Sequence, residues 1–147
     1  MKRLMLILSF LSISIIVFAQ SKNDEAVKAV LKNYKTKIEQ LDTTGIANLF
    51  VKKSNVYENG SSEGTISHYL EHHLGPELKD FKSFSFNNYK VDVQVDGNYA
   101  FTTESYTYVI VLAKDNTEIK RKGIATSVLK KTGGEWKIMV THGSSRK

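Results

Sequence analysis

The chain has 147 residues, carries a formal net charge of +6 and contains no cysteine. Lack of cysteine excludes disulfides, thiolate metal sites and cysteine nucleophiles. The basic residues are scattered, and the clusters Lys120–Lys122 and Lys130–Lys131 are too short to form a nucleic-acid-binding stripe.

Residues 1–19 have the features of a signal peptide. The basic pair Lys2–Arg3 precedes the apolar run Leu4–Phe18, and small residues lead to a cleavage site after Ala19. The run is shorter than the roughly 20 residues of a membrane-spanning helix. We therefore expect a secreted or periplasmic protein that is free of the membrane after cleavage. Residues 20–147 are expected to form a single domain.

Helices dominate the first part of the predicted domain. Residues 24–41 have the apolar spacing of an amphipathic helix, with apolar side chains at Val27, Val30, Leu31, Tyr34, Ile38 and Leu41. A short second helix is predicted through residues 46–50, then a strand over 55–58 and a loop over 61–64. A third helix over 65–80 is expected to divide after Leu74, because Pro76 fits the first turn of a new helix.

From Phe81 onward the apolar period changes to two, which predicts strands. The turns Asp96–Gly97, Lys114–Asn116 and Thr132–Gly134 separate four of them. Helices followed by a hairpin sheet indicate an α+β fold. We expect a strongly curved antiparallel sheet wrapped around the N-terminal helices as a cone with an open mouth.

Three of the four histidines lie in the third predicted helix. At about 100° per residue, His73 and Glu77 fall at the edge of its apolar stripe, whereas His68 and His72 fall on the opposite face. A buried imidazole needs a hydrogen-bonding partner. His73 is therefore either a functional residue paired with Glu77 or a structural histidine of the core.

The fourth histidine, His142, lies on the last predicted strand. Strict alternation would place it on the same face as Trp136, Ile138 and Val140, which are large and apolar. This pattern predicts that His142 faces inward, where it could approach His73 across a pocket. A histidine at the end of the sheet is the structural alternative.

Weaker candidates for ligand binding follow from position alone. Tyr57 and Glu58 end the first predicted strand, and Arg146 follows the last one. Tyr106 shares a strand face with Glu104 and Tyr108, a pattern that core or dimer packing would also explain. An arginine at a pocket mouth could hold a carboxylate bidentately.

Two local patterns carry a resemblance to a known superfamily. They are Leu41-Asp42-x-x-Gly45-x-x-x-Leu49-Phe50 and Gly134-Glu135-Trp136-Lys137-Ile138, which leads into His142. Together with the order of elements they resemble the nuclear transport factor two-like superfamily, in its SnoaL-like form and an exported branch. The resemblance implies a cone-shaped, cystatin-like roll with an interior pocket, and a homodimer formed through the sheet. It implies no single reaction, since members include dehydratases, isomerases and cyclases.

Three functions are compatible with these residues. The first is a small-molecule pocket in which His73, Glu77 and His142 are the polar groups and a histidine–carboxylate pair transfers protons. The second is binding of zinc, copper or iron by the same three residues; the first function requires no cofactor. The third is a non-catalytic, dimeric interaction domain. The sequence leaves open whether the protein is an enzyme.

Overall fold

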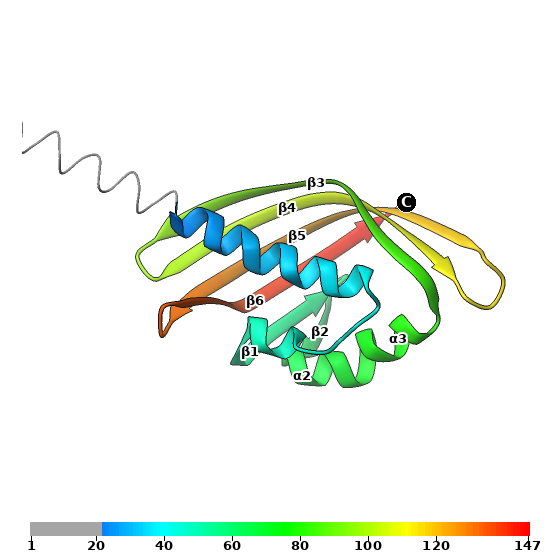
Figure 1. The fold of residues 1–147 in the computed structure, drawn as a ribbon, viewed down its shortest axis with the longest axis horizontal. Coiled ribbons are helices and arrows are strands. Elements are labelled where there is room, and N and C mark those ends of the chain that lie inside the picture. Colours follow the sequence, from blue (N-terminus) through cyan, green and yellow to red (C-terminus); the bar gives the residue numbers. More distant parts are fainter. Residues whose placement is uncertain (1–21) are drawn as a thin grey trace, which may run out of the picture.

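The computed structural model describes residues 22–147, so the predicted signal peptide lies outside the described residues. A long helix over residues 22–39 crosses the concave side of a curved sheet (Figure 1). Val27, Leu31 and Ile38 are its buried apolar residues, as their spacing predicts. The short 3-10 turn η1 (Ile46–Leu49) then leads into the sheet.

The sheet has six strands in the order β2-β1-β6-β5-β4-β3. Their bounds are β1 Phe50–Glu58, β2 Ser61–Gly64, β3 Phe81–Asp96, β4 Tyr99–Leu112, β5 Glu118–Thr132 and β6 Glu135–Arg146. Neighbouring strands are antiparallel except β1 and β6, which are parallel. The predicted α+β cone is confirmed. The segment predicted as a loop over 61–64 is instead strand β2, because it turns back through Asn59–Gly60 and pairs with β1.

Three short helical pieces close one end of the cone (Figure 1). They are α2 (Ile66–Tyr69), the π-helical turn η2 (Leu70–Leu74) and α3 (Gly75–Lys79). The predicted division after Leu74 is confirmed. The N–H of Gly75 donates to the carbonyl of Leu70 across the π turn, and a Cβ at Gly75 would collide with that oxygen. Glycine is therefore required at this position, directly before Pro76.

A β-bulge in β6 reverses the side-chain alternation of the last strand. Val128 pairs with Val140 while Leu129 pairs with Ile138, so Met139 is an extra residue. Before the bulge, Trp136 and Ile138 are buried. After it, Thr141, Gly143 and Ser145 face the concave side.

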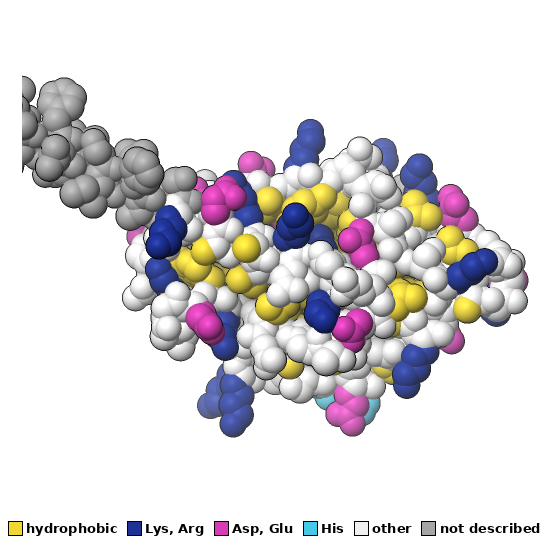
Figure 2. Space-filling view, viewed as in Figure 1, with side chains coloured by type: hydrophobic (Ala, Val, Ile, Leu, Met, Phe, Trp, Pro, Cys, Tyr) yellow, Lys and Arg dark blue, Asp and Glu magenta, His cyan; other side chains and the backbone are white. Residues whose placement is uncertain are grey.

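The core lies between the helices and the concave face of the sheet. Ala100, Leu129, Trp136 and Ile138 supply the sheet side of this core, and each is almost fully buried. Beyond the core the inward residues become aromatic or small, which leaves the wide end unfilled. No helix within residues 22–147 is long and apolar enough to cross a membrane. Figure 2 shows acidic and basic side chains interspersed on the visible face, as the scattered sequence charges predict.

Candidate functional site

The wide end of the cone contains a cavity of about 400 Å³. This volume lies within the range of small-molecule sites, roughly 300–1,000 Å³. The long helix, α2, α3 and strands β1 and β3–β6 all contribute to its wall. Its aromatic lining consists of Tyr34, Tyr57, Tyr69, Phe81, Phe84, Phe86, Tyr106 and Tyr108.

One side of the cavity is formed by a buried ion pair. The Nζ atom of Lys35 lies 3.0 Å from Oε2 of Glu104, and only 10% and 2% of these side chains are exposed. The hydroxyl of Tyr89 donates to the same carboxylate oxygen at 2.7 Å. The Lys35 ammonium also lies 4.5 Å from the ring centroid of Tyr106 and 4.8 Å from that of Phe86. The charge of each partner is thus compensated inside the protein.

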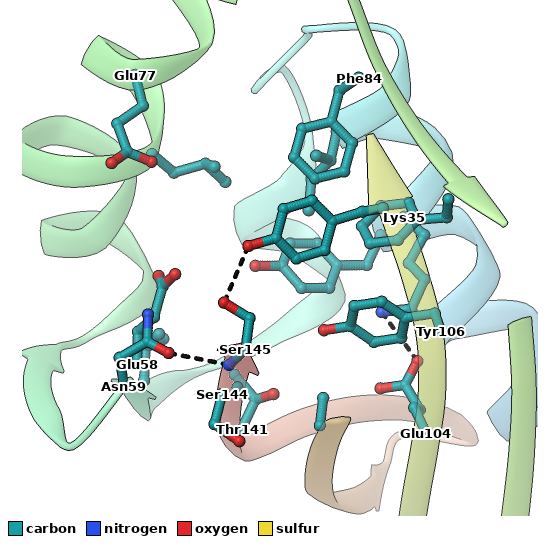
Figure 3. A pocket seen from close by; sticks show the side chains of 18 of the residues that line it. Lys35, Glu58, Asn59, Glu77, Phe84, Glu104, Tyr106, Thr141, Ser144 and Ser145 are labelled. Carbon is teal, nitrogen blue, oxygen red and sulfur yellow. Dashed lines mark hydrogen bonds and ion pairs between the residues drawn. The ribbon is translucent and has the colours of Figure 1, made fainter. Parts of the chain in front are cut away.

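The other side carries carboxylates from β1, β2 and α3 and an imidazole from η2. The Nδ1 atom of His73 lies 2.9 Å from Oε2 of Glu63, and its Nε2 atom lies 3.3 Å from Oε1 of Glu77. The carboxylate of Glu58 lies 3.9 Å from the same Nε2. Glu58 also accepts a hydrogen bond from the Tyr69 hydroxyl at 2.7 Å. Glu58 and Glu77 line the cavity, on the side away from Lys35 and Glu104 (Figure 3).

The neighbours of His73 and Glu77 shift the protonation of both groups. The hydrogen bond to Glu63 is the main cause of a His73 pKa above the ordinary value of 6.5, and burial acts against it. Burial is the main cause of a Glu77 pKa above the ordinary value of 4.5, and His73 acts against it. The imidazole thus holds its proton more strongly than a free histidine, and Glu77 is more basic than a free carboxylate.

Two tyrosine hydroxyls of the cavity have no hydrogen-bonding partner in the described part of the protein. Within residues 22–147, no side chain or backbone group forms a hydrogen bond with the hydroxyl of Tyr34 or Tyr106. Burial and nearby carboxylates hold the pKa of both well above the ordinary value of 10, so both remain protonated donors. The Tyr106 hydroxyl points into the cavity (Figure 3). By contrast, the Tyr108 hydroxyl donates to Ser145 Oγ at 3.0 Å.

The structure brings most of the predicted site residues together. His73 and Glu77 are neighbours as predicted, and Tyr57, Glu58 and Tyr106 line the same cavity as Glu77. The predicted outward position of His68 and His72 is confirmed, because both are exposed.

The predicted inward position of His142 is wrong. His142 is exposed and lines a hollow on the outer face of the sheet, to which Asp92 and Phe101 also contribute. The bulge at Met139 shifts the alternation by one residue, so Thr141 takes the inner position instead. His142 therefore does not approach His73 across the pocket.

Arg146 is also outside the cavity. It is exposed at the end of β6 and lines a second outer hollow with Ile124 and Lys122. The predicted metal ligands His73, Glu77 and His142 are thus not assembled. Among residues 22–147, no group of three or more histidine, aspartate or glutamate side chains could hold a metal ion.

Sequence reasoning missed the contribution of Lys35 and Glu63. Lys35 follows Leu31 by four residues on the apolar face of the first helix, and a lysine there is the signal of a buried partner. Glu63 lay in a segment predicted as a loop. It reaches His73 because β2 turns back beside η2, a contact between residues that no local pattern encodes.

Solved structures share this architecture at low sequence identity. A nuclear transport factor 2-like superfamily protein from Salmonella enterica is 18% identical with a TM-score of 0.76, over 86% of this chain and 93% of that one. A candidate scytalone dehydratase from Novosphingobium aromaticivorans is 16% identical with a TM-score of 0.78, over 89% of each chain. Hexachlorocyclohexane dehydrochlorinase LinA-type3 from Novosphingobium barchaimii is 12% identical with a TM-score of 0.71, over 87% of this chain and 89% of that one. At these identities the likeness shows the fold alone.

The comparison with curated proteins gives no match. The family model described as a SnoaL-like domain matches residues 27–146, which include most of the long helix, the whole sheet and the cavity between them. This chain therefore belongs to the SnoaL-like domain family.

Proposed function

We propose that this protein binds a small organic molecule with a flat, mostly apolar body. The observation that carries the proposal is the cavity of about 400 Å³ lined by aromatic rings. The hydroxyls of Tyr34 and Tyr106 support it, because both residues line the cavity and their hydroxyls, without a partner among the described residues, can donate hydrogen bonds to a ligand.

A matched pair of variants tests this binding site. Ala125 lines the cavity and is 6% exposed, whereas its neighbour Thr126 is exposed on the outer face. Naphthol, a flat neutral probe, should raise the melting temperature of the wild type and of Thr126→Leu. Ala125→Leu should fill the cavity and abolish that shift. Equal shifts in both variants would place the probe elsewhere and contradict the proposal.

Proton transfer to or from the bound molecule is the second proposed function. Glu77 lines the cavity, and its Oε1 atom lies 3.3 Å from Nε2 of His73. The other ring nitrogen of His73, Nδ1, pairs with Glu63. In this arrangement the Glu77 carboxylate accepts a proton from the ligand, while the His73 imidazolium orients and stabilises its ionised form. Dehydratase and dehydrochlorinase are activities named for proteins of the same fold, which supports elimination as the reaction class.

Export and dimerisation belong to the same proposal. Cleavage after Ala19 would release the domain into the periplasm or medium, which N-terminal sequencing of the exported protein would test. The outer sheet face exposes 49% of Phe101 and 55% of Ile124, and these residues support its use as a homodimer surface. Ile124→Lys should then lower the mass measured by light scattering from dimer to monomer; an unchanged mass would argue against this surface.

A further inference from the structure

The two sides of the cavity differ in charge balance. Lys35 and Glu104 compensate each other on one side. On the other side His73 is the cationic side chain that forms ion pairs with Glu58, Glu63 and Glu77. That side therefore has three carboxylates for one imidazole, and two of the carboxylates face the cavity.

We propose that the ligand carries a protonated amine, which binds between Glu58 and Glu77 while its flat body packs against the aromatic wall. This inference rests on the proposed binding function and names the chemical class of its ligand. A primary or secondary ammonium supplies several N–H donors, and each cavity carboxylate has oxygen atoms that can accept them.

The aromatic wall already stabilises one cation. The Lys35 ammonium lies 4.5 Å from the ring centroid of Tyr106 and 4.8 Å from that of Phe86. The negative faces of such rings attract positive charge. The remaining rings of the wall, among them Phe84 and Tyr108 with a centroid distance of 5.3 Å, offer similar surface to a ligand cation.

An anionic ligand would be repelled by the same side of the cavity. Lys35, the lysine that residues 22–147 contribute to the wall, is held by Glu104, and the carboxylates of Glu58 and Glu77 would repel a ligand carboxylate. Partial burial makes ionised Glu77 less favourable than a free carboxylate, and so raises its pKa. A bound ammonium would reduce this cost, whereas a bound carboxylate would increase it.

Three probes that share a flat body and differ in charge separate the effect of charge from that of shape. They are naphthylethylamine, naphthylethanol and naphthylacetate. We expect the amine to bind roughly tenfold more tightly than the alcohol at neutral pH, and the acid to bind most weakly, by isothermal titration calorimetry. Glu58→Gln and Glu77→Gln each keep the size of the side chain and remove its charge. Each should bring the amine affinity close to that of the alcohol and lower the alcohol affinity far less than the amine affinity.

Glu71→Gln is the matched control, because Glu71 lies in η2 but is 74% exposed and outside the cavity wall. It should leave the affinity of all three probes unchanged. If the alcohol binds in the cavity at least as tightly as the amine, the amine proposal is wrong and the binding function stands. If none of the probes binds, both proposals fail. An equal loss of amine affinity in Glu71→Gln would show that the overall electrostatic field of the surface, and not the cavity, attracts the amine. This result would also overturn the amine site.

Discussion

The Nε2 atom of His73 lies 3.3 Å from Oε1 of Glu77, four residues further along the chain and across the junction of η2 and α3. This contact connects a partly buried ion pair, Glu63–His73, to a carboxylate in the cavity wall. The protonation of the imidazole therefore influences the charge that a bound molecule meets.

Proton exchange at a bound ketone should depend on Glu77. Tetralone, a flat ketone with exchangeable protons next to its carbonyl, should lose those protons to deuterated water faster when the protein is present. Glu77→Gln should slow the catalysed exchange by roughly a hundredfold or more, the usual contribution of a general base. NMR integration of the ketone protons measures this rate. A Glu77→Gln rate equal to the wild-type rate would rule out Glu77 as the base.

The stability contributed by His73 should fall as pH rises. Its pKa is raised on folding, so the folded state binds the proton more tightly than the unfolded chain. The stabilisation is then complete below the ordinary value of about 6.5 and is lost as pH rises through the higher folded value. Urea denaturation across this range should show the loss in wild type and in His72→Gln, but not in His73→Gln. A similar slope in His73→Gln would assign the effect to another group.

Breaking the Lys35–Glu104 pair should destabilise the fold more than removing both charges. Lys35→Met leaves the Glu104 carboxylate, 2% exposed, without a cation, and should cost about 3–5 kcal/mol of unfolding free energy. Lys35→Met combined with Glu104→Gln should recover much of that loss. Denaturant titration of the two single variants and the double variant gives the coupling. Additive losses would show that the two charges act independently.

Tyr106 and Tyr108 should respond differently to loss of their hydroxyls. Tyr106→Phe should leave stability unchanged, because no described protein group forms a hydrogen bond with that hydroxyl. It should weaken the binding of a ligand that has an acceptor oxygen. Tyr108→Phe removes the bond to Ser145 and should cost about 0.5–1.5 kcal/mol. Thermal unfolding and naphthol titration separate the two effects. A stability loss in Tyr106→Phe would indicate an internal partner for its hydroxyl.

Local periodicity was sufficient to predict the α+β architecture and the proximity of His73 and Glu77. Both depend on contacts within one element or on alternation along a strand. Periodicity was not sufficient to predict which face of the sheet His142 occupies. The extra residue Met139 leaves no signal in the composition, yet it reverses the direction of every later side chain of β6. Nor could periodicity find the Lys35–Glu104 pair, since these residues meet only when the helix crosses the finished sheet.

The same bulge has a consequence for how binding sites of this kind can change. The inner positions after Met139 are Thr141, Gly143 and Ser145, and their small side chains leave the wide end of the cone empty. If Met139 were instead paired within a regular ladder, the alternation would turn Val140 and His142 inward, into the space that the cavity now occupies. Loss of the bulge with Met139 retained could therefore convert a hollow domain into a filled one. The pairing of this strand, and not only residue identity, decides whether the domain has an interior to offer a ligand.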